Sequence, residues 1–230
     1  MKRLAAAILC AALVIRSACT ASPKTQYLAL TFDDGPSGAL TDRLLDTLAD
    51  SGAHATFFVC AYRVRQYPDR LQRIAREGHE IGLHTCCHAD LRRLTYEQTL
   101  EDLAECQIAV TECCGVRARL LRPPEGFYGR QTLRAAHALG LSVVLWSVDT
   151  DDWDASQRAD VLPRILRGAS DGAVILLHEL SEHSVRCAAE AIRQLQARGF
   201  VFVTLSELAA RSRTELLPGT VYRSFPVEDG

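Results

Sequence analysis

Two clusters of polar residues in this 230-residue chain could hold a metal ion and do chemistry beside it. The first is His84-Thr-Cys-Cys-His88, in which two imidazoles four residues apart can meet on one face of a helical turn and reach one cation. Its adjacent cysteines point in different directions, and the chain has no Cys-x-x-Cys pair to complete a structural zinc site. The spacing therefore favours the histidines as ligands. Two neighbouring histidines without a metal are the alternative on this stretch alone.

The second cluster is Asp33-Asp34, which closes an apolar run and precedes a Gly-Pro turn signal. Strand alternation would point the two carboxylates apart, so that one could hold a metal while the other faces a bound water. Asp34, His84 and His88 would then form a two-histidine, one-carboxylate set with positions left open for water and substrate. A catalytic metal lowers the pKa of its water and polarises a carbonyl oxygen, and Asp33 is then a natural general base. By itself, Asp-Asp-Gly is equally a solvated turn.

Apolar runs alternate with amphipathic ones about every thirty residues, which predicts a β/α fold. The predicted strands are residues 27–32, 55–60, 80–85, 118–123, 142–149, 173–179 and 200–205, and the predicted helices are 40–52, 68–77, 95–113, 130–139, 156–167 and 184–198. Such a pattern predicts a parallel sheet covered on its outer side, either a barrel or an open doubly wound sheet, and seven repeats fit a barrel better. The segments TFDDGP, LHTCCH, LRPPEG, SVDTDDW and LLHEL all close predicted strands. That rim is where β/α enzymes assemble their active sites.

The ends of the chain predict export and one domain. Residues 1–21 combine a Lys-Arg pair, a twelve-residue apolar run and small residues, the pattern of a signal peptide or lipoprotein leader. Cleavage near Ala21 and acylation at Cys19 are both open, and a buried N-terminal helix is the remaining alternative. We expect a protein that is secreted or attached to the outer face of the cell membrane, with a catalytic domain over 24–211 and a loosely ordered tail over 212–230.

Composition narrows the classes of partner. The chain is 48% hydrophobic and 23% charged with a formal charge of −2, which indicates a folded protein and gives no case for binding nucleic acid. A neutral or weakly charged substrate is allowed, and no stable protein partner is implied. Removing the leader leaves seven cysteines, so at least one thiol should stay free. Disulfide pairing stays open among Cys60, Cys86, Cys87, Cys114 and Cys187.

The segments TFDDG, HTxxH, RPP, DxxDW and LLH, in this order, resemble the five motifs of the polysaccharide deacetylases of carbohydrate esterase family four. The likeness runs from Leu28 to about Leu208. It implies a distorted (β/α) barrel of about seven parallel strands. It also implies a metal-dependent hydrolase that removes acetyl groups from N-acetylated amino sugars of glycans such as peptidoglycan. Two histidines and a carboxylate suit zinc, and cobalt, nickel or manganese could occupy the same ligands.

The resemblance implies a role for each matched residue. Asp33 matches the catalytic base, and Asp34, His84 and His88 match the metal ligands. Thr85 would brace the loop between the histidines. Arg122 matches the arginine that pairs with the base and holds it ionised and oriented.

The last two motifs carry the acid and part of the substrate site. His178 matches the acid that protonates the leaving amine, and Asp152 the carboxylate that orients it. Trp153 would form a wall of the substrate site, and Leu176 would line the pocket for the acetyl methyl group. A backbone N–H near Glu125 would help to stabilise the oxyanion.

Two positions depart from the family pattern. Glu125 stands where an aromatic residue often borders the substrate groove, and Glu179 replaces an aspartate after the last histidine. The leading reading is an N-deacetylase that acts on peptidoglycan. An esterase for O-acetylated glycans such as xylan is an alternative. A non-catalytic glycan-binding relative is another, although the losses of base, ligand or acid that mark such proteins are absent here.

Overall fold

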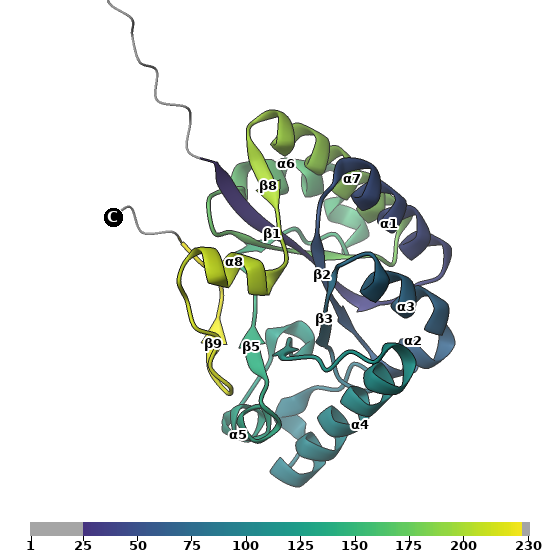
Figure 1. Cartoon of the computed structure of the whole chain (residues 1–230), viewed down its shortest axis with the longest axis vertical. Helices are drawn as coiled ribbons and strands as arrows, with labels where there is room; N and C mark the ends of the chain where they lie inside the picture. The colour runs from purple at the N-terminus through teal and green to yellow at the C-terminus, as the bar shows by residue number, and fades with distance from the viewer. Residues whose placement is uncertain (1–24, 227–230) are drawn as a thin grey trace, which may run out of the picture.

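The computed structural model describes residues 25–226, which form a curled parallel sheet with helices packed along its outer side (Figure 1). The strands are β1 (Gln26–Gly35), β2 (Ala55–Val59), β3 (Glu80–Leu83), β4 (Leu120–Leu121), β5 (Ser142–Val144), β6 (Val148–Asp149), β7 (Val174–His178), β8 (Phe200–Phe202) and β9 (Val221–Tyr222). The α-helices are α1 (Ala39–Ser51), α2 (Ala61–Gln66), α3 (Pro68–Arg76), α4 (Tyr96–Cys114), α5 (Arg130–Leu139), α6 (Val161–Gly168), α7 (Glu182–Ala197) and α8 (Leu205–Arg211). Three short 3-10 helices are η1 (Leu91–Arg93), η2 (Pro124–Gly126) and η3 (Ala155–Asp160).

The sheet curls because its two ends are joined by a very short link. Its order is β6-β7-β1-β2-β3-β4-β5-β9, and β8 pairs with the start of β1. Strands β5 and β6 therefore lie toward opposite ends of the path, yet only residues 145–147 separate them in sequence. A link of that length spans little more than 10 Å, so the sheet must bend almost into a ring. The predicted distorted barrel is confirmed, and the predicted strand 142–149 is divided into β5 and β6.

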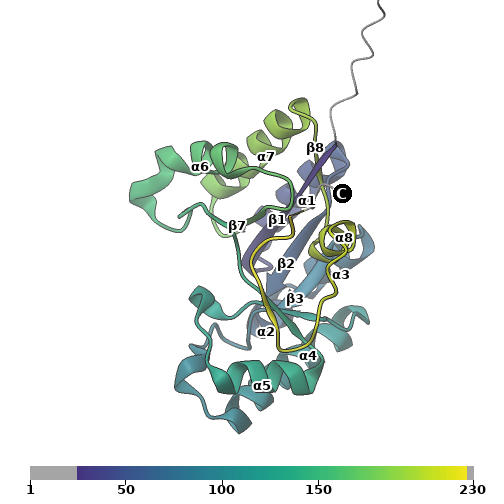
Figure 2. The same ribbon diagram turned by 90° about the vertical axis from the view of Figure 1, so that its left-hand side faces the viewer.

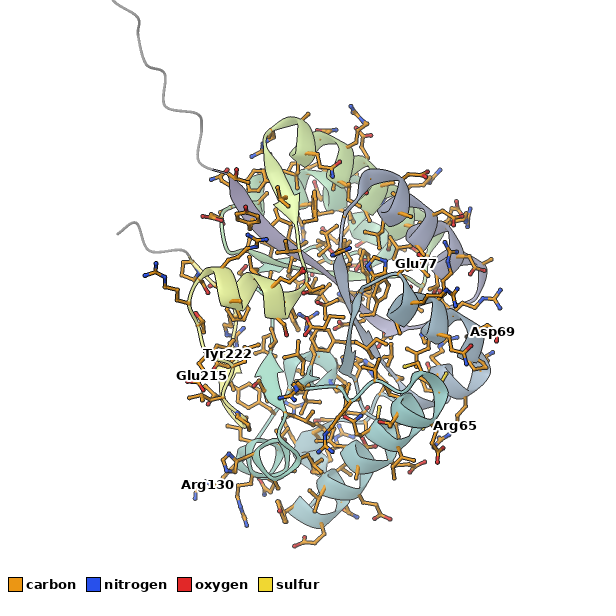
Figure 3. The ribbon with its side chains drawn as sticks, in the orientation of Figure 1. Arg65, Asp69, Glu77, Arg130, Glu215 and Tyr222 are labelled. Carbon is orange, nitrogen blue, oxygen red and sulfur yellow. The ribbon has the colours of Figure 1, made fainter. Side chains whose placement is uncertain are left out.

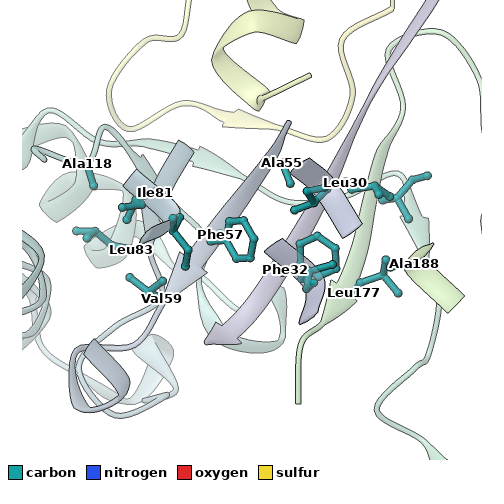
Figure 4. Close-up of a cluster of buried hydrophobic side chains, with 14 of the residues drawn as sticks. Leu30, Phe32, Ala55, Phe57, Val59, Ile81, Leu83, Ala118, Leu177 and Ala188 are labelled. Carbon is teal, nitrogen blue, oxygen red and sulfur yellow. The ribbon is translucent and has the colours of Figure 1, made fainter. Parts of the chain in front are cut away.

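The long strand β1 separates two hydrophobic clusters by alternation. Leu28, Leu30 and Phe32 point into the larger cluster under the helices, and the rings of Phe32 and Phe57 stack with centroids 5.3 Å apart (Figure 4). Ala29 belongs to the smaller cluster, which also contains Phe58 and residues of α8. Since alternate residues of a strand face opposite sides, Thr31 and Asp33 point to the same side as Ala29. This side leads to the mouth of the barrel.

Helices cover the outer side of the sheet along its whole width. Figure 2 shows α6 and α7 grouped at one end of the molecule and α4 and α5 at the other, with β1, β2 and β3 between them. Helix α1 ends at Gly52, whose φ of 64° terminates it where the sequence predicts a stop. Helix α4 begins with a capping box formed by Thr95 and Gln98. None of the helices in the described part of the chain is long and apolar enough to cross a membrane.

The tail is better ordered than the sequence predicts. Residues Val221–Tyr222 form β9, which pairs with β5, and Phe225 is completely buried in the smaller cluster. The Tyr222 hydroxyl also donates a hydrogen bond to the carbonyl of Glu215 at 2.8 Å, and Figure 3 labels both residues. The expectation of a loosely ordered tail is therefore wrong up to residue 226, because a few apolar side chains suffice to hold a polar segment on the sheet edge. The predicted leader lies outside the described residues.

Candidate active site

Both carboxylates of the Asp33-Asp34 pair face the same side chain, His84. The Nε2 atom of His84 lies 3.3 Å from Asp34 Oδ1 and 3.9 Å from Asp33 Oδ2. The register of β1 against β2 shifts between Asp33 and Gly35, and Asp34 adopts a φ of 70°. The expectation that alternation points the carboxylates apart is wrong, since this bulge turns Asp34 back toward the mouth of the barrel. The left-handed conformation of Asp34 is costly for a non-glycine residue and is typical of functional sites.

Asp34, His84 and His88 form a group that could hold a metal ion. Their ligand atoms all lie within 4.8 Å of one another. Asp34 Oδ1 is 3.3 Å from His84 Nε2 and 3.4 Å from His88 Nε2. Two ligands about 2.1 Å from a tetrahedral ion lie roughly 3.4 Å apart, so these spacings suit one small cation. Asp34 Oδ1 is also buried without a hydrogen-bond partner in the described structure, and a bound cation would satisfy it.

The neighbourhood of His84 leaves the correct nitrogen free for a metal. His84 Nδ1 lies 2.7 Å from the Arg122 carbonyl oxygen, which can only accept, so the proton resides on Nδ1 and the lone pair on Nε2. Such a hydrogen bond behind a histidine ligand fixes its orientation and raises its basicity. The side chain of His84 is buried, whereas that of His88 is 38% exposed. The site is therefore closed on the His84 side and open at His88.

The segment between the histidines is a turn and not a helix. Thr85 and His88 adopt φ values of 71° and 56°, so the prediction that a helical turn brings the imidazoles together is wrong in its geometry. The rings nevertheless meet, with centroids 5.3 Å apart. Thr85 is fully buried, and its Oγ1 accepts a hydrogen bond from the Ala89 backbone N–H at 3.0 Å. This contact spans the turn and braces it in the way expected for Thr85.

Electrostatics favour the ionised form of Asp34. Burial raises its pKa, but the neighbouring imidazoles of His84, His178 and His88 outweigh burial and lower the pKa of Asp34 to about 2. The carboxylate is then ready to receive a cation at neutral pH.

Asp33 lies beside the metal group and is held by Arg122. The guanidinium is fully buried, and its Nη1 donates to Asp33 Oδ1 at 2.8 Å and to Thr31 Oγ1 at 2.7 Å. Nε and Nη2 donate to the carbonyls of Val144 and Leu145 at 3.0 and 2.8 Å. Burial lowers the pKa of Arg122, whereas Asp33 raises it, and an arginine keeps its proton under such conditions. Every side of this cation is satisfied, so it can fix the orientation of Asp33.

His178 and Asp152 form a second pair across the mouth of the barrel. His178 Nδ1 lies 2.7 Å from Asp152 Oδ1, and the His178 backbone N–H donates to Oδ2 at 2.9 Å. Burial lowers the pKa of His178, but the hydrogen bond and charge of Asp152, with the charges of Asp33 and Asp34, raise it to about 9. His178 is therefore protonated at neutral pH, as a general acid requires.

A groove of about 510 Å³ joins these groups. It is lined by Leu176, which is buried, and by Glu125 and Trp153, which are exposed; the Trp153 ring is 70% exposed. All ten residues predicted to form the site lie on this groove or directly behind it: Asp33, Asp34, His84, His88, Arg122, Glu125, Asp152, Trp153, Leu176 and His178. The sequence did not single out three further lining residues, Trp146, Asp149 and Asp151. Their position between β5 and the DxxDW segment could have suggested them.

The cysteines of the His84–His88 turn do not face the metal group. Cys86 is buried and its Sγ donates to the Asp102 carbonyl at 3.3 Å, whereas Cys87 is exposed. Burial raises the pKa of Cys86, which disfavours the thiolate that a metal would need. All seven cysteines between residues 25 and 226 are free thiols in this structure. The positions of Cys86 and Cys87 agree with the prediction that the cysteines are not metal ligands.

Comparison with known proteins identifies the family to which the chain belongs. A family model described as polysaccharide deacetylase matches residues 20–144. The peptidoglycan-N-acetylmuramic acid deacetylase PdaC of Bacillus subtilis is 37% identical over 82% of this chain and 40% of its own length. The peptidoglycan-N-acetylglucosamine deacetylase PgdA of Listeria monocytogenes is 36% identical over 79% of this chain and 38% of its own. The chain thus spans about two fifths of these two relatives.

Solved structures share the fold closely. A structure described as "T48 deacetylase with substrate" superposes with a TM-score of 0.80 at 37% identity, covering 86% of this chain and 96% of that one. A family 4 acetyl xylan esterase from Clostridium thermocellum, solved in complex with a cobalt ion, superposes with a TM-score of 0.80 at 30% identity. This superposition covers 87% of the present chain and 100% of the esterase chain.

Proposed function

Because the chain belongs to the polysaccharide deacetylase family, we propose that it is a metal-dependent hydrolase that removes N-acetyl groups from amino sugars of peptidoglycan and releases acetate. One observation carries the proposal: a carboxylate held by a buried arginine, a three-ligand metal group and a protonated histidine meet around one groove. Amide hydrolysis needs a base, an electrophile and an acid in this arrangement. The curated relatives named as peptidoglycan deacetylases support the substrate class.

Asp34, His84 and His88 would hold the cation, and we propose zinc because two imidazoles and a carboxylate suit it. Bound there, the ion would act as a Lewis acid toward the acetamide carbonyl and the attacking water.

The residues of the chain divide the proton transfers between them. Asp33 accepts a proton from the water that attacks the acetamide carbon, while Arg122 holds its carboxylate in place. His178 then gives a proton to the leaving nitrogen. Its Nδ1 is engaged by Asp152, so Nε2 is the atom that donates. The backbone N–H of Glu125 itself, whose φ of 56° turns the chain at the groove wall, donates to the developing oxyanion.

The base and the acid have separate partners of opposite charge, since Asp33 pairs with the cation of Arg122 and His178 with the anion of Asp152. The substrate acetyl group would rest against Leu176, and the sugar ring against the exposed face of Trp153.

We further propose that the protein works outside the cell membrane, as a secreted or surface-attached enzyme. The leader pattern of residues 1–21 and the location of peptidoglycan support this placement.

The test is acetate release by the zinc-loaded protein from peptidoglycan fragments, compared with acetylated xylo-oligosaccharides. Asp33→Asn, which keeps the metal group, serves as the control for non-enzymatic release. The proposal expects release from the N-acetylated glycan that the Asp33→Asn variant lacks. Release from the O-acetylated glycan alone would favour an esterase, a second candidate supported by the likeness to the acetyl xylan esterase. A protein that binds glycan but releases acetate from neither would be a non-catalytic relative.

A further inference from the structure

Arg158 is a cation that the proposed reaction does not use, and it lines a hollow beside His178. The hollow has a volume of about 240 Å³. Asp34, Trp153 and His178 line both this hollow and the main groove, so the two spaces are continuous. A group attached to a sugar whose acetamide lies near His178 could therefore extend into the hollow.

The backbone of Arg158 is fixed while its guanidinium is free. Arg158 lies in η3, whose first turn is capped by Asp154 Oδ1, which accepts from the Ser156 backbone N–H at 2.8 Å. On the other side, His183 Nε2 donates to the Arg158 carbonyl at 2.8 Å. Within residues 25–226, no side-chain hydrogen bond or ion pair engages the exposed Arg158 guanidinium.

Neighbouring arginines are already paired. Arg164 bonds Asp151 and donates to Gln157 Oε1 at 2.9 Å, and Arg43 pairs with Glu182. Arg158 thus differs from Arg164 and Arg43, because its charge is available to a ligand.

The charges of the site are arranged unevenly along the groove. Glu125, Asp149 and Asp151 line the main groove but not the hollow, whose charged walls are Asp34, Asp152, His178 and Arg158. Asp152 is engaged by His178 and Asp34 belongs to the metal group, which leaves Arg158 as the charge that a ligand in the hollow can pair with. An anionic substituent that reaches the hollow would be attracted by Arg158. Trp153 and Leu180 are exposed at the hollow by 70% and 39% and offer apolar contact to a sugar ring.

We propose that Arg158 selects glycans that carry a carboxylate beside the acetamide to be cleaved, by forming an ion pair with that carboxylate in the hollow next to His178. The inference rests on the proposed function and narrows its substrate class. N-acetylmuramic acid residues without a stem peptide supply such a carboxylate, on the lactyl ether of the carbon next to the one that bears the acetamide, and N-acetylglucosamine has none. In an alternating glycan the carboxylate belongs either to the sugar that loses its acetyl group or to that sugar's neighbour.

The test measures glycan binding separately from turnover. Dissociation constants are determined by calorimetry for the zinc-loaded full chain carrying Asp33→Asn, with and without Arg158→Gln. Three ligands are compared: a tetrasaccharide of alternating N-acetylglucosamine and N-acetylmuramic acid, the same tetrasaccharide with its carboxylates methyl-esterified, and chitotetraose. Arg167→Gln is the matched control, because Arg167 is also exposed but lies on α6 and lines neither space.

The proposal expects Arg158→Gln to weaken binding of the free-acid tetrasaccharide about fivefold to tenfold and to change binding of the ester and of chitotetraose less than twofold. Arg167→Gln should change none of the three. Equal weakening of all three ligands, no weakening of the free acid, or no detectable binding of the free acid would overturn it.

Turnover of the protein with Asp33 intact locates the carboxylate and separates the two proposals. Mass spectrometry of the tetrasaccharide product shows whether the muramic or the glucosamine residue loses its acetyl group. If no glycan yields acetate, the proposed reaction fails, while the binding comparison still decides the role of Arg158.

Discussion

Replacing Asp152 with asparagine should lower the pKa of His178 and with it the upper pH limit of activity. The carboxylate lies 2.7 Å from His178 Nδ1, and the two side chains are 1% and 16% exposed. Asp152, with the charges of Asp33 and Asp34, raises the pKa of the imidazole from 6.5 to about 9 against the opposing effect of burial. A tenfold change in protonation corresponds to about 1.4 kcal/mol, so the charged form of His178 is favoured by roughly 3 kcal/mol.

Asparagine keeps the shape of Asp152 but removes its charge, which leaves burial opposed only by the charges of Asp33 and Asp34. The pKa of His178 should then fall toward its ordinary value. A return from about 9 to 6.5 would lower the protonated fraction at pH 8 from about nine tenths to a few per cent, and kcat/KM roughly thirtyfold through protonation alone. The alkaline limb of the pH profile should move to lower pH in the variant.

The same change has a consequence for stability. Because the folded pKa of His178 lies above its unfolded value, the pair stabilises the protein fully below about pH 6.5 and loses this contribution as the pH rises through about 9. Asp152→Asn should therefore cost at most roughly 3 kcal/mol of unfolding free energy at pH 6 and much less above pH 9.

The assay combines NMR titration of the His178 ring in the metal-free protein, assigned with His178→Gln, and the pH profile of kcat/KM in the zinc-loaded protein. Asp160→Asn is the matched control, since it removes an exposed carboxylate that caps no backbone group and does not contact His178. The reasoning is refuted if His178 titrates near 6.5 in the unaltered protein, or if Asp152→Asn leaves its pKa where it was.

Three further predictions concern the surroundings of the site. Replacing Cys86 or Cys87 with serine should leave one zinc per chain by elemental analysis, because neither thiol faces Asp34; loss of metal in either variant would contradict the ligand assignment. Arg122→Met should lower the free energy of unfolding by about 3–5 kcal/mol in urea, because it leaves the Asp33 carboxylate buried and unpaired, and a loss below 1 kcal/mol would show that the pair matters little. Glu179 is fully buried, and burial raises its pKa to about 8 despite the hydrogen bond from Thr41. The unfolded chain loses this proton at lower pH than the folded protein, so the free energy of unfolding of the unaltered protein should fall from pH 4.5 to 8. Glu179→Gln lacks this titration, so between pH 4.5 and pH 7 its free energy of unfolding should rise by roughly 2–3 kcal/mol relative to that of the unaltered protein. Parallel pH profiles of the two proteins would contradict this.

The sequence places the predicted site residues at one rim of the sheet, because the motifs that contain them lie at or just after the carboxyl ends of strands in a regular β/α pattern. In a parallel sheet the carboxyl ends of the strands gather at one rim, so Asp33, His84, Arg122 and His178 must come together once the strands are placed correctly. The ten predicted residues could be named from this topology together with the resemblance of the motifs to those of the family.

The local backbone could not be predicted in the same way. Asp34, Thr85 and His88 all have positive φ, and no simple rule of alternation or helical spacing anticipates this. These conformations depend on contacts from distant segments, such as the hydrogen bond between His84 and the Arg122 carbonyl.

The tail and the divided strand 142–149 were missed for a similar reason. Strand β9 has two residues and little periodicity, and its place is set by pairing with β5 and by the burial of Phe225. The break between β5 and β6 follows from closing the ring of strands, which is a property of the whole sheet.

The central claim is that Asp33 acts as the base while Asp34, His84 and His88 hold the metal. Metal titration together with acetate release tests it most directly. Zinc binding by calorimetry and acetate release from peptidoglycan fragments would be measured for the unaltered protein, Asp33→Asn and His84→Ala. We predict that Asp33→Asn binds zinc as tightly as the unaltered protein but releases no acetate, whereas His84→Ala loses both. Equal loss of zinc in the two variants, or turnover that survives in Asp33→Asn, would contradict the account.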